Sequence, residues 1–453
     1  MENDSIGQQP TDQVDALAEA QGDQGGKPVQ LGLFFVLLLF VVVFIYGAWS
    51  WTQFFAQPQG VNSNRVVLFT QTDFPAIVIA SRILTSGQGG DLYDLDRQLE
   101  GQQRLTSEGY LSLSGQDNLD LKYPYPYSPF IAVLWSPLSG LSPLTQMALW
   151  DVLNLVLMAG GLWYLLASLP MNRTMRLLLL LGGLTSFPFI VNLQQGQSSG
   201  IVMFAWAMGF ALLRQGRDLP AGLAFGLLAL KVQWIPLLLL VLVWKRRWKA
   251  LLGIGTVSLA LLSLTILLIG TAWIGDYIGV IQRAQQGARE FLLDPWYSHS
   301  LTGGLTALFG RDAKGAIRLA NLGFTLLAAG GLLYVWRGRW SPGTIRWEAA
   351  AAITFLATAL TNSHLNTHDL SLLVLPAALG MAAFAATRTT DRTARVWLYF
   401  LPAAYLVISL PPPLIFGLPV RLSTLAMLVM LLLLYISSRL MGDHVTSSKI
   451  QQI

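Results

Sequence analysis

The chain has 453 residues, of which 53% are hydrophobic and only 12% are charged, and its mean hydropathy is +0.53. A soluble protein of this length carries about a quarter charged residues, so the composition excludes a soluble globular protein and predicts an all-α polytopic membrane protein. The net charge of +5 is expected to reside in loops at a membrane face, because the sequence lacks the basic helix with interleaved aromatic residues that binds nucleic acid.

The first 30 residues are polar and rich in acids, which predicts a disordered cytoplasmic tail for residues 1–30. They lack the basic start of a signal peptide, and the apolar run after them is too long for one. The run LGLFFVLLLFVVVFIYGAW is therefore expected to remain as the first membrane span.

Apolar runs long enough to cross a membrane recur along the rest of the chain. The short stretch 128–140 is flanked by prolines, which favours a re-entrant or surface helix. We expect about twelve transmembrane helices, near residues 31–52, 143–168, 176–192, 198–213, 219–231, 233–244, 250–273, 313–336, 346–362, 369–387, 395–410 and 417–438.

The basic residues divide the predicted loops between two faces. On one face, the short loops 193–197, 363–368 and 411–421 contain a single Lys or Arg residue, Arg421. Short basic loops stay in the cytoplasm, so the other face is predicted to be the inner one. It receives Lys27, Arg173, Arg176, Arg214, Arg217, the run KRRWK at 245–249, Arg337, Arg339, Arg346, Arg388, Arg392, Arg395, Arg439 and Lys449.

This topology depends on residues 219–244, which form either one tilted span or two short helices joined at KVQW (231–234). A single span would reverse every later loop and place three basic loops outside. Two helices keep those loops inside and leave Lys231 deep in the structure, where a charge is costly and usually functional.

Most of the unusual polar residues then fall on the outer face. They lie in a long first outer loop, 53–128, in the segment NLQQGQSS, in a second outer loop, 274–312, and in the cluster TNSHLNTHDL at 361–370. Such an asymmetry is typical of a membrane-embedded site that opens outward.

Each candidate residue has a structural alternative. Asp73 either caps the helix predicted after it or takes a proton from an acceptor hydroxyl. Lys231 either extends toward the membrane interface or neutralises a phosphate there. Gln197 belongs to an ordinary Gln/Gly/Ser turn or hydrogen-bonds sugar hydroxyls, while Arg283 and Arg289 lie on a solvated helix face or contact phosphate.

His364 and His368 are four residues apart and would share one face of a helix. That spacing suits zinc, but two ligands do not make a site, and the sequence has neither an HExxH pattern nor any cysteine. The alternatives are that the histidines cap a span in water, or that they donate to a phosphate oxygen while Asp369 orients one imidazole.

The polar segments together resemble a known family in their order along the chain, from about Asp73 to Pro376. After Asp73 follow GQGGDLYDL, YPYPYSPFIAVLWSPLSGLSPLTQMALWDVLNL, the long segment from NLQQGQSSG through LLALKVQW to KRRW, then SHSLTGGL and NSHLNTHDLSLLVLP. This order is similar to that of glycosyltransferase family 87, the polyprenol-phosphate-mannose-dependent mannosyltransferases with a GT-C fold.

The resemblance implies a GT-C catalytic module over residues 31–310, including outer loops 53–128 and 274–312. Residues 311–440 would add helices that complete the donor and acceptor cavity, and 441–453 would be a cytoplasmic tail. The enzyme would lie in a bacterial cytoplasmic membrane with its site on the extracytoplasmic face. It would move a sugar, with mannose expected, from a polyprenyl-phosphate-linked donor to a glycolipid or glycan acceptor, with inversion and no covalent intermediate.

The resemblance also implies roles for particular residues. Asp73 would be the general base, and the implied donor-phosphate contacts are Lys231, His364, His368 and Arg289. The implied sugar or acceptor contacts are Asp369, Gln197, Tyr123, Asn366 and His299. We expect no cofactor, leave a metal requirement open and expect membrane lipids but no nucleic acid as partners. The competing interpretation is a transporter or lipid flippase that uses the same outward polar cavity.

Overall fold

The computed structural model describes residues 69–113, 115–286, 298–362, 364–385 and 422–435, together with Leu38, Val41, Val42, Ile45 and Val66. The described part is helical and contains no β-strand, which confirms the all-α prediction there. The predicted spans 31–52 and 395–410 fall largely or wholly outside the described residues.

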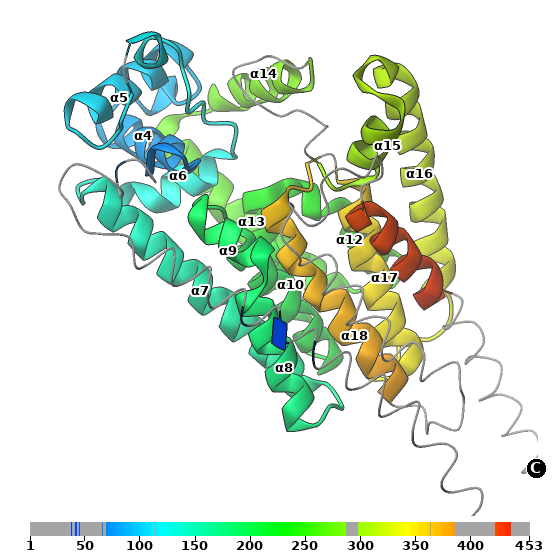
Figure 1. The fold of residues 1–453 in the computed structure, drawn as a ribbon. Helices are drawn as coiled ribbons and strands as arrows, with labels where there is room; N and C mark the ends of the chain where they lie inside the picture. Colours follow the sequence, from blue (N-terminus) through cyan, green and yellow to red (C-terminus); the bar gives the residue numbers. More distant parts are fainter. Residues whose placement is uncertain are drawn as a thin grey trace, which may run out of the picture.

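The described part of the predicted first outer loop, together with residues 129–138, forms a layer of short helices at one end of the molecule (Figure 1). Its packing centre is aromatic: Phe74 lies 6.2 Å from Trp135, and Trp135 lies 5.0 Å from Trp150 of the next long helix, measured between ring centroids. The predicted helix after Asp73 and the predicted surface helix at 128–140 both occur in this layer. Its elements are α4 (Phe74–Thr85), η1 (Gly89–Asp91), α5 (Leu95–Ser107), η2 (Gly115–Asn118), α6 (Pro129–Trp135) and η3 (Ser136–Leu138).

Three helices then follow the layer: α7 (Pro143–Ser168), a broken pair made of α8 (Arg173–Thr185) and α9 (Phe187–Gln194), and α10 (Ser199–Arg214). The axis bends by 43° between α8 and α9. Ser186 caps α9 by accepting from the Phe189 amide, and Pro188 occupies the first turn, where a missing N–H costs nothing. The predicted span 176–192 is therefore two helices.

The segment 218–244 is broken at Lys231, whose φ of −133° and ψ of 73° are not helical. It consists of α11 (Asp218–Gly226), η4 (Leu227–Trp234) and α12 (Pro236–Trp244), and α13 (Trp248–Ile269) follows. A Cβ on Gly222 would overlap the backbone of Ala250, and one on Gly226 would lie 2.5 Å from the Val257 Cβ. Helices α11 and α13 thus pack directly side by side in the same direction, so the chain must run back along α12 before α13 begins. This arrangement agrees with two short helices joined at KVQW.

The remaining elements begin with α14 (Trp273–Gln286) and α15 (Leu301–Phe309), which lie at the same end as the layer of short helices (Figure 1). They continue with η7 (Arg311–Ala313), α16 (Lys314–Val335), α17 (Ile345–Thr361), η8 (Thr367–Leu373), α18 (Val374–Ala385) and a helix over Leu422–Tyr435.

Three described helices are long and apolar enough to cross a membrane, and the bent pair α8 and α9 gives a fourth. They are Pro143–Ser168, Trp248–Ile269 and Arg311–Val335. Several other predicted spans are helices of 10–17 residues, among them Ser199–Arg214 and Thr367–Ala383. The described residues thus form a membrane-type helical bundle with fewer full-length spans than the twelve expected.

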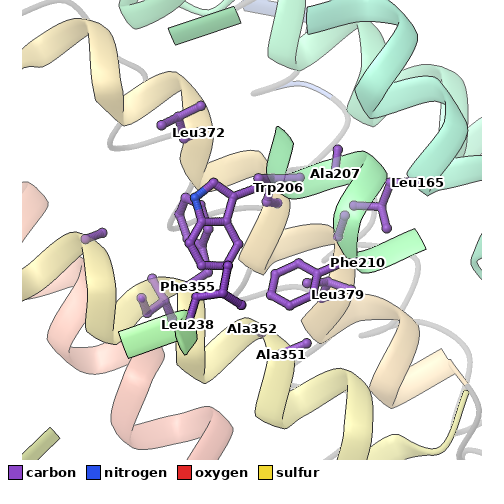
Figure 2. Close-up of a cluster of buried hydrophobic side chains, with 14 of the residues drawn as sticks. Leu165, Trp206, Ala207, Phe210, Leu238, Ala351, Ala352, Phe355, Leu372 and Leu379 are labelled. Carbon is purple, nitrogen blue, oxygen red and sulfur yellow. The ribbon is translucent and has the colours of Figure 1, made fainter. Parts of the chain in front are cut away.

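The bundle core is built around aromatic rings of α10 and α17 (Figure 2). Trp206 is fully buried and packs edge to face on Phe355 at 5.2 Å and on Phe225 at 5.7 Å. Alanines of α17, such as Ala351 and Ala352, fill the remaining space and let the helices approach closely.

Loops that the basic-residue pattern assigned to one face do meet at one end of the bundle. The Arg214 Nε lies 2.6 Å from Glu348, and Arg247 forms an ion pair with Asp218. The Lys245 Nζ donates to the Trp336 carbonyl at 2.9 Å. The ends of α10, α12 and α16 and the starts of α11, α13 and α17 are therefore tied together, opposite the layer of short helices.

Candidate active site

A tight turn between α9 and α10 is the centre of the polar site. Gly196 has a φ of +63°, which glycine adopts without strain. A side chain there would also be obstructed, because a Cβ on Gly196 would lie 2.6 Å from the Phe74 Cβ. This close approach seats the start of α4 on the turn, where the Asp73 amide donates to the Gln195 carbonyl at 3.2 Å.

Asp73 occupies the N-cap position of α4, yet its side chain makes no capping hydrogen bond. Instead, the Asp73 Oδ2 accepts from the Gln197 Nε2 at 2.5 Å. Asp73 is exposed, but the protein around it desolvates the carboxyl and raises its pKa above the ordinary value, against the lowering effects of Gln197 and the Lys231 charge. Helix capping therefore does not explain this residue, and a solvent-reachable carboxyl with a raised pKa suits proton transfer.

The Gln197 amide joins Asp73 to a tyrosine of the YPYPYSPF segment. The Gln197 Nε2 also lies 3.2 Å from the Tyr127 hydroxyl, and the main-chain carbonyl of Gln197 accepts from the Trp150 indole at 3.0 Å. The predicted Tyr123 instead donates its hydroxyl to the Thr70 carbonyl at 2.5 Å, in a buried position. Of these two tyrosines, it is Tyr127 that reaches the Gln197 amide.

A buried ion pair lies on the other side of the turn. The Lys231 Nζ is 2.9 Å from the Asp369 Oδ1, and the two residues are only 8% and 1% exposed. The break in η4 places Lys231 here, while Asp369 also accepts from the Ser199 hydroxyl at 3.1 Å. The Asp369 carboxylate thus receives two donors from different helices and holds the ammonium group in place.

The histidines of TNSHLNTHDL lie in different environments. His368, in η8, is buried; its Nδ1 is 3.3 Å from the Gln195 Oε1, and its Nε2 is 3.5 Å from the Asp369 Oδ2. His364 lies in the loop before η8, so the two residues do not share a helix face. Burial lowers the pKa of His364, which favours its neutral form.

Two further predicted contacts, Asn366 and His299, have structural partners. Asn366 caps η8 in a reciprocal box with Asp369, whose Oδ2 accepts from the main-chain N–H of Asn366 at 3.3 Å. The His299 Nδ1 is 2.7 Å from the Ser423 hydroxyl, and its Nε2 is 3.1 Å from the Thr367 hydroxyl. His299 therefore bridges the start of α15 to η8 and the helix over Leu422–Tyr435.

The predicted phosphate contact Arg289 lies outside the described residues, and Arg283 lies in α14. Within the described part, no group of three or more His, Asp or Glu side chains is arranged to hold a metal ion.

Sequence reasoning missed two residues of this network, Tyr127 and Ser199, whereas Gln195 was weighed with Gln197 as part of the Gln/Gly/Ser turn. Tyr127 is the last tyrosine of YPYPYSPF, and Ser199 follows two residues after Gln197. The only signal for them was their proximity in sequence to residues already singled out.

The described residues define a helical membrane protein with a polar site at one end, in which a carboxyl group faces solvent and a lysine is held by an acid. A family model, Glycosyltransferase family 87, matches residues 125–363, more than half of the chain. The chain belongs to glycosyltransferase family 87 and is a membrane glycosyltransferase. Comparisons with curated proteins and with solved structures find no match.

Proposed function

We propose that this protein is an inverting glycosyltransferase that moves a sugar, mannose, from a polyprenyl-phosphate-linked donor to a hydroxyl of a glycolipid or glycan acceptor. In this proposal it is a GT-C enzyme with about twelve spans, in a bacterial cytoplasmic membrane. Its site opens on the extracytoplasmic face, since the basic loops lie at the opposite end of the bundle.

One observation supports the proposal most strongly: a continuous polar connection links the exposed acid to the buried cation. It runs from Asp73 through the Gln195–Gln197 turn to His368, and from there through Asp369 to Lys231. An inverting transfer needs a proton acceptor on one side of the sugar and positive charge or hydrogen-bond donors on the other. In the proposed site, Asp73 would be the proton acceptor, and Lys231 with the histidines would supply the positive charge and the donors.

The proposed reaction assigns each group a step. The acceptor hydroxyl attacks the anomeric carbon, its proton passes to the Asp73 carboxylate, and the bond from the anomeric carbon to the phosphate oxygen breaks. The electron pair leaves with polyprenyl phosphate. Lys231 stabilises this anion, with His364 and His368 donating hydrogen bonds, while Asp369 positions Lys231. Because phosphate is a stable leaving group, stabilising its charge is the larger task, and the base acts late.

Replacing the proposed base tests this function. Asp73→Asn and Asp73→Ala should abolish transfer from radiolabelled polyprenyl-phosphate-mannose, while the protein is still inserted and folded. Asp91→Asn is a matched control, because Asp91 lies exposed in the same outer layer and has only a 3.8 Å contact with Arg97. Wild-type turnover by either Asp73 variant would refute the assignment.

Measuring the affinity for the donor tests the proposed phosphate contacts separately from the proposed base. Lys231→Ala and His368→Ala should raise the KM for the donor more than the KM for the acceptor, because the proposed contacts are with the donor phosphate. Unchanged donor affinity in both variants would contradict the placement of the phosphate. Substrate movement across vesicles without glycosyl transfer would instead favour a transporter, an interpretation that membership of a glycosyltransferase family disfavours.

A further inference from the structure

A second feature lies at the end of the bundle opposite the candidate active site. The turn between α12 and α13 reads WKRRWK, Trp244–Lys249, and we refer to these six residues as the basic turn. The proposed glycosyl transfer makes no use of them, so the chemistry of the basic turn needs its own explanation.

Two of its four bases are held by the protein. The Lys245 Nζ donates to the Trp336 carbonyl at 2.9 Å and also to the Gly338 carbonyl. Arg247 pairs with Asp218 and lies over the Trp340 ring, 4.9 Å from its centroid. These contacts fix the backbone of the basic turn against the start of α11 and the end of α16.

The other two bases, Arg246 and Lys249, are exposed, and neither has a hydrogen-bond or ion-pair partner among the described residues. Arg217, next to Asp218, adds a third exposed base. Between residues 214 and 249 the only acid is Asp218, which Arg247 already engages. The surface at the basic turn is therefore positively charged without internal compensation.

The backbone of Arg246 is unusual as well. Its φ of +50° is the only positive value among the non-glycine residues that the structure describes. Glycine would adopt that conformation without strain, so an arginine there holds an exposed guanidinium on a rigid, strained turn. A strained residue held in place by its neighbours is typical of a functional position.

Two exposed tryptophans flank these bases. Trp244 is 52% exposed and Trp248 is 62% exposed, so the large apolar rings lie beside free positive charges. Tryptophans occupy the boundary between acyl chains and headgroups, and basic residues beside them attract anionic lipid phosphates. A ligand with both an anionic head and an apolar body fits this surface better than a free anion does.

We propose that the basic turn is a binding site for an anionic phospholipid, with Arg246 and Lys249 contacting the headgroup phosphate and Trp244 and Trp248 lying at the acyl boundary. Arg217 widens the positive surface. This lipid is distinct from the glycosyl donor, because the basic turn lies at the end of the bundle opposite Asp73 and Lys231.

Lipid titration by native mass spectrometry tests the proposal, with phosphatidylglycerol compared against phosphatidylcholine of the same acyl chains. Arg246→Gly and Lys249→Gln should each weaken phosphatidylglycerol binding by about 5-fold and leave phosphatidylcholine binding unchanged. Arg104→Gln is the matched control, since Arg104 is an exposed base in α5, in the outer layer, and the substitution removes one charge in the same way.

Arg246→Gly separates lipid binding from folding, because glycine relieves the positive φ. Its Tm in lipid-free detergent should equal or exceed that of the wild type, while the rise in Tm on adding phosphatidylglycerol should shrink. Undiminished phosphatidylglycerol binding in both variants would overturn the proposal. So would an equal loss in Arg104→Gln, or an equal rise in Tm with inorganic phosphate alone.

Discussion

The buried ion pair between Lys231 and Asp369 should affect the free energy of unfolding, and substituting each residue singly should measure that effect. At 2.9 Å, two unit charges attract by about 6 kcal/mol at an effective dielectric of about 20, and desolvation offsets much of that gain. Removing one partner leaves the other charge buried and unpaired. We therefore expect Lys231→Met and Asp369→Asn each to lower the free energy of unfolding by about 3–5 kcal/mol.

Combining Lys231→Met with Asp369→Asn should cost less than the larger single effect, because no uncompensated charge remains. Unfolding of the purified protein in detergent, followed across all four members of the cycle, measures the coupling. Arg82 and Glu108 form the control pair: they lie 2.8 Å apart but are 26% and 36% exposed, so breaking their contact should cost less than about 1 kcal/mol. Additive costs at Lys231 and Asp369, or single costs as small as the control, would refute the reasoning.

Three further predictions follow from the site and the topology. Gln197→Leu removes a donor that favours the Asp73 carboxylate, so it should raise the pKa of Asp73 further and shift the acid limb of the pH profile of kcat/KM to higher pH; a shift to lower pH would contradict this sign. Gly196→Ala should destabilise the protein by about 1–3 kcal/mol in thermal unfolding, because it combines a positive φ with contact against Phe74, whereas Gly87→Ala, also at positive φ but in open space, should cost less. Because the chain has no cysteine, single cysteines can be introduced in place of Gln194, Asp276 and Asn366. All three should react with a membrane-impermeant reagent added outside. Reaction of the cysteine at position 366 only from inside would reverse the topology.

Individual helices were predictable where an apolar run ends at clear capping signals. The span expected at 143–168 is α7, Pro143–Ser168, because Ser142 accepts from the Thr145 amide and a proline follows it in the first turn. The span expected at 176–192 was wrong in one respect, since it bends at Ser186. The start of a new helix was indicated locally by Ser186 as N-cap and Pro188 in the first turn. A hydropathy profile does not detect such a break, because the whole segment is apolar.

The polar site was only partly predictable, because its contacts join residues far apart in the sequence. Asp73 and Gln197 each stood out as polar residues between apolar runs, yet their hydrogen bond spans 124 positions. No local pattern specifies that contact; it depends on how α4 packs against the turn at Gly196. Tyr127, and not the predicted Tyr123, reaches Gln197 for the same reason, since packing decides which of two similar tyrosines makes this contact.

The relation between Asp73 and the ion pair follows from how the Gln195–Gln197 turn is built. Gln197 binds Asp73 through its side chain, while Gln195 binds Asp73 through its carbonyl and His368 through its amide oxygen. Three residues of one rigid turn therefore set the position of the acid relative to the Lys231–Asp369 pair. A change that moves this turn should alter both the proton-accepting group and the phosphate contacts together. Substitutions within the ion pair should act mainly on the phosphate contacts, and their one effect on Asp73 is the higher pKa that follows loss of the Lys231 charge. The two proposed halves of the site can be separated experimentally on that basis.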